Sequence, residues 1–83
     1  MGALTVHVLD ENQEPVAGER VYCNFVRSVL GLLDTHDERY ADGYGVAEFD
    51  DVPDCTVEVI VRGEVQVKVV VGSNDHEDVT VSV

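Results

Sequence analysis

The most regular feature of the chain is an alternation of apolar and polar residues with a period of two. Valine supplies much of it, at 19 of the 83 residues. Successive side chains of a β-strand point to opposite faces of the sheet, and β-branched residues favour that conformation. The pattern therefore predicts an all-β protein. No linker, low-complexity tract or repeat interrupts it, so we expect residues 1–83 to form a single domain.

Seven strands follow from the alternation, separated by turn-forming segments such as DENQEP, DGYG, RGE and GSNDHED. The expected strands are Leu4–Leu9, Arg20–Val26, Glu38–Ala41, Val46–Asp50, Cys55–Val61, Val65–Val71 and Val79–Val83. The residues expected to point into the core are Leu4, Val6, Val8, Val21, Cys23, Phe25, Ala47, Phe49, Cys55, Val57, Val59, Val61, Val65, Val67, Val69, Val71, Val79, Val81 and Val83. Short strands with a turn about every ten residues indicate a seven-stranded antiparallel Greek-key β-sandwich.

One apolar segment, RSVLGLLDTHD, does not fit the alternation. Its residues Val29, Leu30, Leu32 and Leu33 form a short patch broken by Gly31, too brief to separate a helical turn from a strand. Two interpretations stay open. The patch covers one open end of the core, or it is a contact surface for a protein partner.

Two blocks of turn and core residues carry a family resemblance. They are Asp10, Pro15, Val16, Gly18 and Val21, followed by Asp42, Gly45, Ala47, Phe49, Val52 and Pro53. In this spacing the chain resembles the carboxypeptidase regulatory-like family, whose relatives include transthyretin-like, collagen-adhesin B-type and starch-binding-like sandwiches. The resemblance implies a prealbumin-like sandwich but specifies function poorly. The chain departs from the family pattern in having Ala41 for threonine, no glycine in the first turn, and Cys55 in the place of a core tyrosine.

The charge balance is strongly acidic, with 17 Asp and Glu against 5 Lys and Arg and a formal net charge of −12. Such a surface repels phosphate backbones and anionic lipid, so we expect neither nucleic acid nor membrane partners. High acid content with a single lysine resembles proteins of halophilic archaea. Because salt screens self-repulsion, we expect stability to rise with salt. The alternative is an acidic mesophilic domain that is merely very soluble.

The residues that could carry catalysis do not form a recognisable motif. Ser28, Ser73 and Ser82 lack a nucleophile elbow, and no histidine is placed beside them by sequence. Collagen-adhesin relatives use a first-strand lysine for an isopeptide crosslink, but that strand here reads LTVHVL and Lys68 lies on the sixth. Hydroxyisourate-hydrolysing relatives need a specific C-terminal tetrapeptide, whereas this chain ends TVSV. We therefore predict no catalytic residue and no cofactor.

Metal and sugar sites are the remaining candidates. Three acidic clusters occur: Asp34, His36, Asp37 and Glu38; Asp75, His76, Glu77 and Asp78; and Asp50, Asp51 and Asp54. None has the spacing of an EF-hand or zinc site, so we interpret them as solvated loop charges and assign no metal. Tyr22, Tyr40 and Tyr44 are the aromatic candidates for a sugar platform. His7 alternates with valines and is expected on the solvent face of its strand.

These observations predict a non-catalytic β-sandwich module for protein–protein interaction or structural support, with an unknown protein or neighbouring domain as partner. The alternative is a carbohydrate- or calcium-binding domain. The start of the chain, MGALTVHVLD, shows no signal peptide, so we expect a cytoplasmic protein with Cys23 and Cys55 reduced in the core. If the chain is part of a larger secreted protein, the location becomes extracellular. No apolar run approaches the roughly 20 residues of a membrane span.

Overall fold

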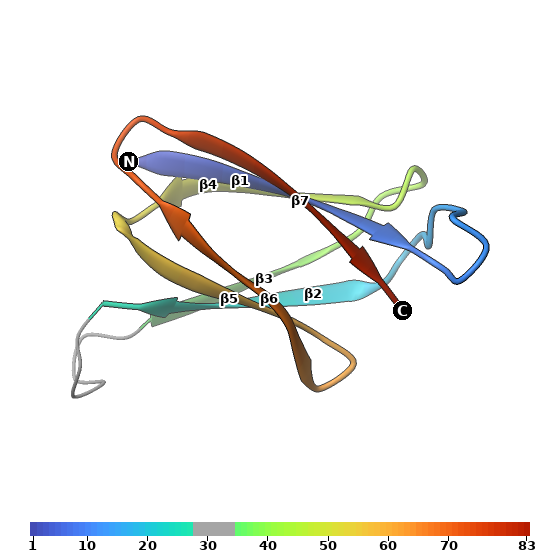
Figure 1. The fold of residues 1–83 in the computed structure, drawn as a ribbon. Coiled ribbons are helices and arrows are strands. Elements are labelled where there is room, and N and C mark those ends of the chain that lie inside the picture. Colours follow the sequence, from blue (N-terminus) through green and yellow to red (C-terminus); the bar gives the residue numbers. More distant parts are fainter. Residues whose placement is uncertain (28–34) are drawn as a thin grey trace.

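The fold is a sandwich of two facing β-sheets, seen edge-on in Figure 1. The structure is a computed structural model that describes residues 1–27 and 35–83. Its strands are β1 (Gly2–Leu9), β2 (Arg20–Val26), β3 (Thr35–Tyr40), β4 (Val46–Val52), β5 (Cys55–Val61), β6 (Glu64–Val71) and β7 (His76–Ser82). The expectation of an all-β, two-sheet domain is confirmed for the described residues. The largest differences in strand bounds are that β3 begins at Thr35 instead of Glu38 and that β7 begins at His76 instead of Val79, within the segment GSNDHED that was expected to be a loop.

The strand order is β4-β1-β7 in one sheet and β3-β2-β5-β6 in the other. β1 pairs antiparallel with β4 but parallel with β7, so the prediction of a wholly antiparallel sandwich is wrong at this pairing. The cause is the β6–β7 connection, which crosses between the sheets and delivers β7 to the start of β1. There the Ala3 N–H donates to the Asp75 carbonyl at 2.8 Å. Alternation of apolar and polar residues looks the same whichever way a strand runs, so the sequence pattern cannot distinguish parallel from antiparallel pairing.

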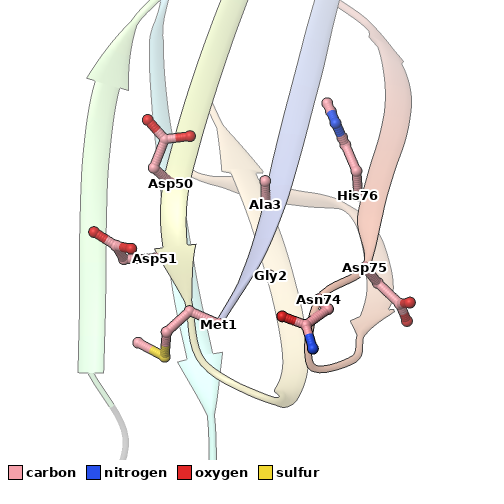
Figure 2. A pocket seen from close by; sticks show the side chains of 8 residues that line it. All are labelled: Met1, Gly2, Ala3, Asp50, Asp51, Asn74, Asp75 and His76. Carbon is pink, nitrogen blue, oxygen red and sulfur yellow. The ribbon is translucent and has the colours of Figure 1, made fainter.

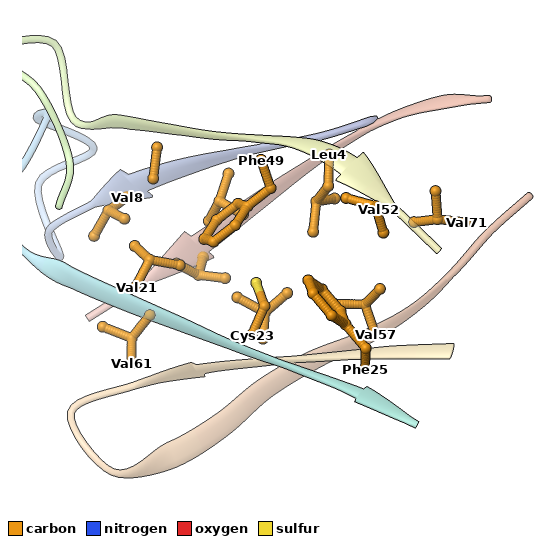
Figure 3. Close-up of a cluster of buried hydrophobic side chains, with 14 of the residues drawn as sticks. Leu4, Val8, Val21, Cys23, Phe25, Phe49, Val52, Val57, Val61 and Val71 are labelled. Atoms are coloured by element: carbon orange, nitrogen blue, oxygen red, sulfur yellow. The ribbon is translucent and has the colours of Figure 1, made fainter. Parts of the chain in front are cut away.

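The core fills the space between the sheets with side chains from both (Figure 3). Its largest fully buried residues are Phe49, Leu4, Val6, Val8, Val21, Val52, Val57, Val59, Val61, Val71 and Cys23. The predicted inward residues of β1, β2, β4 and β5 are thus confirmed. Both cysteines are buried and not bridged, as expected. Burial, and secondarily the Asp37 carboxylate, raises the pKa of the Cys23 thiol to about 12.

Val65 was predicted to point into the core, but in the structure it points outward. A bulge separates the pairs Val59↔Val67 and Ile60↔Val65, leaving Gln66 as an extra residue in β6. The bulge inverts the alternation, so Val65 joins Ile60 on the outer face and is 48 % exposed. Val67 and Val69 still pack against the core, and Val71 is fully buried.

Two aspartates build the turns at one end of the sandwich. The Asp10 carboxylate accepts the backbone N–H groups of Asn12 and Glu14. Asp42 does the same for Tyr44 and Val46 in the β3–β4 turn. These aspartates stand at two of the positions that carry the family resemblance, and here they hold turns in place.

Candidate functional site

The predicted contact patch of Val29, Leu30, Leu32 and Leu33 lies outside the described residues. The candidate sites described below are formed by residues 1–27 and 35–83. Within these ranges, no helix is long and apolar enough to cross a bilayer.

The outward side of the β3-β2-β5-β6 sheet, which we call the four-strand face, carries several exposed apolar side chains. Cross-strand register places its residues in rows. The four-strand face comprises Arg20, Tyr22, Asn24, Val26, His36, Glu38, Tyr40, Thr56, Glu58, Ile60, Val65, Lys68 and Val70. Among the described residues, the exposed large hydrophobics are Met1, Tyr40, Tyr44, Val65 and Val70. Three of these five belong to the four-strand face.

Two apolar rows cross this face. In one, Tyr22 stands opposite Ile60, and Ile60 stands opposite Val65. In the other, Thr56 lies between Val26 and Val70, and Val70 is 67 % exposed. Side chains directly opposite one another on neighbouring strands are in contact range, so each row is a continuous strip.

A polar row separates the two apolar ones, and its groups are already paired. The Asn24 amide donates to Glu58 at 2.9 Å, and Lys68 lies 3.6 Å from the same carboxylate. At the edge, Arg20 donates to Glu38 at 2.6 Å. That hydrogen bond and the charge of Glu38 raise the pKa of the Arg20 guanidinium.

The aromatic residues proposed for sugar binding are dispersed. The Tyr22 ring is stacked on His36, with centroids 5.3 Å apart, and the Arg20 guanidinium lies 5.4 Å from its centroid. The ring is therefore already engaged within the protein. Tyr40 is exposed at the end of β3, and Tyr44 is exposed in the β3–β4 turn. The sequence candidates do not form one platform.

Charge is segregated between the two layers. The strands β1, β4 and β7, which we call the acidic layer, hold five carboxylates and no lysine or arginine: Glu48, Asp50, Asp51, Glu77 and Asp78. The strands of the β3-β2-β5-β6 layer hold three cations and four carboxylates: Arg20, Arg39 and Lys68 with Asp37, Glu38, Glu58 and Glu64. Ion pairs join Arg20 to Glu38, Arg39 to Asp37, Arg62 to Glu19 and Lys68 to Glu58. Among the strands, the three-stranded sheet thus carries carboxylates alone, whereas the four-stranded sheet is nearly balanced. A further seven carboxylates lie in the connections between the sheets: Asp10, Glu11, Glu14, Glu19, Asp42, Asp54 and Asp75.

An open pocket of about 490 Å³ lies at the edge of the acidic layer (Figure 2). Its lining residues are Met1, Gly2, Ala3, Asp50, Asp51, Asn74, Asp75 and His76. The fold thus brings together parts of two acidic clusters that are distant in sequence. In Figure 2, however, the Asp75 side chain points away from Asp50 and Asp51. In residues 1–27 and 35–83, no three His, Cys, Asp or Glu side chains are placed to hold a metal ion.

The His36 cluster is divided by the pleat of β3. His36 and Glu38 lie on the four-strand face, whereas Asp37 pairs in register with Cys23 and so lies on the opposite side. Its neighbouring ligand candidates therefore cannot converge on one ion.

Sequence reasoning missed one hydroxyl–imidazole pair, because it considered only serines. Thr5 and His76 are hydrogen-bonded at 2.8 Å across the parallel β1–β7 pair, and Thr5 is only 7 % exposed. In register, Thr5 lies between Glu48 of β4 and Asp78 of β7. Carboxylates on both sides would disfavour the negative charge that develops when a hydroxyl attacks a carbonyl. We therefore interpret the pair as a link between strands. The predicted outward placement of His7 is confirmed, since His7 lies 3.6 Å from Asp78 on the same face.

Comparisons with known proteins give a likeness of fold to part of a solved structure. No protein-family model and no curated protein matches the chain. Among solved structures, the chain is similar to part of a 9R-lipoxygenase from Cyanothece PCC8801, with a TM-score of 0.54 and 16 % sequence identity. The match covers 98 % of this chain and 16 % of the lipoxygenase. At this identity the likeness shows the fold alone.

Proposed function

We propose that the chain is a non-catalytic β-sandwich module that contacts another protein or a neighbouring domain through the four-strand face. The observation that carries the proposal is the pair of mostly apolar rows at outward positions, in which Val65 is about half exposed and Val70 is 67 % exposed. Exposed apolar side chains gathered on one face of a small domain are typical of an interaction site. The nearly balanced charges of this layer also avoid the repulsion that the acidic layer would impose on most protein partners.

We further propose that the module is a Greek-key, transthyretin-like sandwich of the carboxypeptidase regulatory-like family. Two observations support this assignment. The strand order places β4 and β7 on either side of β1, so the chain crosses repeatedly between the sheets. Asp10 and Asp42, which carry the resemblance, both build turns.

The lipoxygenase likeness supports the module interpretation in one respect. The matching region is about one sixth of that protein, so a sandwich of this shape occurs there as one part of a longer chain. We propose a comparable role as a unit that serves a larger assembly, and we do not transfer the lipoxygenase activity. Halophilic origin and cytoplasmic location remain predictions, the former supported by the acidic layer.

The test compares a double variant of the four-strand face with a matched control. Val65→Thr with Val70→Thr keeps the β-branched shape while making both side chains polar. Val46→Thr makes the same change on the outer side of the other sheet. Each protein is immobilised and incubated in 2 M KCl with extract from the source cells. We expect the parent and Val46→Thr to retain the same partner protein from the extract. We expect the double variant not to retain it. Equal retention by all three would overturn the proposal.

Titration calorimetry in the same salt addresses the alternative function. We expect no saturable heat with CaCl₂ or with soluble oligosaccharides. Saturable binding of either ligand that the double variant leaves intact, in a protein that retains no partner, would favour the ligand-binding alternative.

A further inference from the structure

We infer that the four-strand face binds a second copy of this chain, so that two sandwiches pack with their four-stranded sheets together. This inference rests on the proposed function, since it names the occupant of the same surface. It follows from where the charges lie, how the rows repeat, and how much area the face offers.

Charge decides which face of one copy can approach another. The acidic layer, whose strands carry five carboxylates and no lysine or arginine, would repel its own copy. The four-strand face carries ion pairs that are satisfied within each chain, namely Arg20–Glu38 and Lys68–Glu58. With sheets stacked about 10 Å apart, a face-to-face dimer would separate its two acidic sheets by about 30 Å. That is about three Debye lengths at 0.1 M salt and about ten at 1 M.

The row pattern is self-complementary. A polar row containing Asn24, Glu58 and Lys68 lies between two apolar rows. A two-fold axis lying in the plane of the face, either along the rows or along the strands, therefore places apolar row on apolar row and polar row on polar row. Because Asn24 and Lys68 already contact Glu58, closing the face leaves these polar groups with partners.

The area of the face predicts a weak dimer. Four strands about 4.8 Å apart and seven residues long at about 3.3 Å each give roughly 450 Å² per copy, or about 900 Å² in total. Stable interfaces bury about 1,200–2,000 Å². We therefore expect association at high protein concentration, and more strongly in concentrated salt, where repulsion between the two net charges is screened.

Sedimentation equilibrium of the purified chain tests the inference. In 2 M KCl the parent is expected to dimerise, and lowering KCl to 0.05 M is expected to shift it toward monomer. Val65→Thr with Val70→Thr is expected to weaken dimerisation by about tenfold or more, whereas Val46→Thr leaves it unchanged. Ile60→Thr, in the same row as Val65, serves as an independent third substitution. Far-ultraviolet circular dichroism and thermal melts establish that each variant folds.

Three outcomes have distinct meanings. A dimer weakened by the face variants alone supports the inference. A parent that stays monomeric up to about 1 mM in 2 M KCl overturns it, given the weak affinity expected from the area. A dimer that all variants leave intact also overturns it, because the contact then lies elsewhere. If the parent is monomeric yet retains a different protein through Val65 and Val70, the inference fails and the proposed function stands.

Discussion

The guanidinium of Arg39 on β3 lies over the ring of Phe49 on β4, with its central carbon 5.8 Å from the ring centroid, so a cation from one sheet covers the largest core residue of the other. Arg39 also pairs with Asp37 at 2.6 Å. Register places Arg39 opposite Val21 and Asp37 opposite Cys23, on the inward side of the sheet. The edge strand β3 thus closes one flank of the sandwich with charged side chains. Inward-pointing charges at an edge also discourage unwanted strand addition.

The Arg39–Phe49 contact predicts an energetic coupling across the sheets. Arg39→Gln should reduce the free energy of unfolding by about 1 kcal/mol, and a double-mutant cycle with Phe49→Leu should show a coupling of about 0.5–2 kcal/mol. Urea unfolding in 2 M KCl provides the measurement. Arg62→Gln, which removes an ion pair away from any aromatic ring, should show no coupling to Phe49. A coupling near zero for Arg39 would show that the contact contributes nothing.

The segregation of charge predicts which carboxylates cause salt dependence. Glu48 and Asp78 flank Thr5 in neighbouring strands of the acidic layer. Glu48→Gln should therefore raise the melting temperature in 0.05 M KCl by a few degrees and have little effect in 2 M KCl, where repulsion is screened. Glu64→Gln, in the four-stranded layer, serves as the control. It should leave the difference in melting temperature between 0.05 M and 2 M KCl unchanged. The idea fails if the parent melts at the same temperature in both.

The Cys23 thiol predicts both low reactivity and a loss of stability in alkali. Its pKa in the folded protein is raised to about 12 from an ordinary value of 9.0. The unfolded state therefore releases its proton first, so this contribution to stability is complete below pH 9 and is lost between pH 9 and 12. In a Cys55→Ala background, iodoacetamide at pH 8 should leave Cys23 unmodified until the protein unfolds. Modification at the rate of a free cysteine would contradict the burial.

Two glycines in one turn provide a matched pair of substitutions. Gly45 has a φ of +73°, and an added Cβ would lie 2.7 Å from the Val8 carbonyl oxygen. Gly43 has open space around it. Gly45→Ala should destabilise the fold by at least about 1–2 kcal/mol, and Gly43→Ala by less than about 0.5 kcal/mol. Similar urea midpoints for the two variants would contradict the turn geometry.

The sequence predicted most of the core because period-two alternation and burial on one face are the same physical fact. Val57, Val59 and Val61 are inward for that reason. Val65 could not be placed correctly, because the bulge at Gln66 depends on how β6 pairs with β5. The parallel pairing of β7 with β1 could not be predicted either, because the alternation pattern does not indicate the direction of a strand. Asp37 and Arg39 point inward because of the register in which β3 pairs with β2, and the sequence alone does not predict that register.

The sequence does contain an indication of the four-strand face, namely apolar residues at positions that alternate outward. Ile60 and Val70 are apolar residues at positions already expected to point outward, and β-strand propensity alone could explain them. Their alignment with Tyr22 and Val26 appears only once the strand order is known. The same holds for the charge segregation, which brings together carboxylates from β4 and β7 that are far apart in the chain.

Amide chemical shifts recorded by NMR in 2 M KCl at increasing protein concentration test the central claim most directly. If the four-strand face is the contact surface, the amides of Tyr22, Ile60, Val65 and Val70 should shift with concentration, while those of Thr5, Glu48 and Asp78 stay constant. Shifts confined to β1, β4 and β7 would contradict self-association through the four-strand face, and spectra that do not change up to about 1 mM would contradict the binding of a second copy.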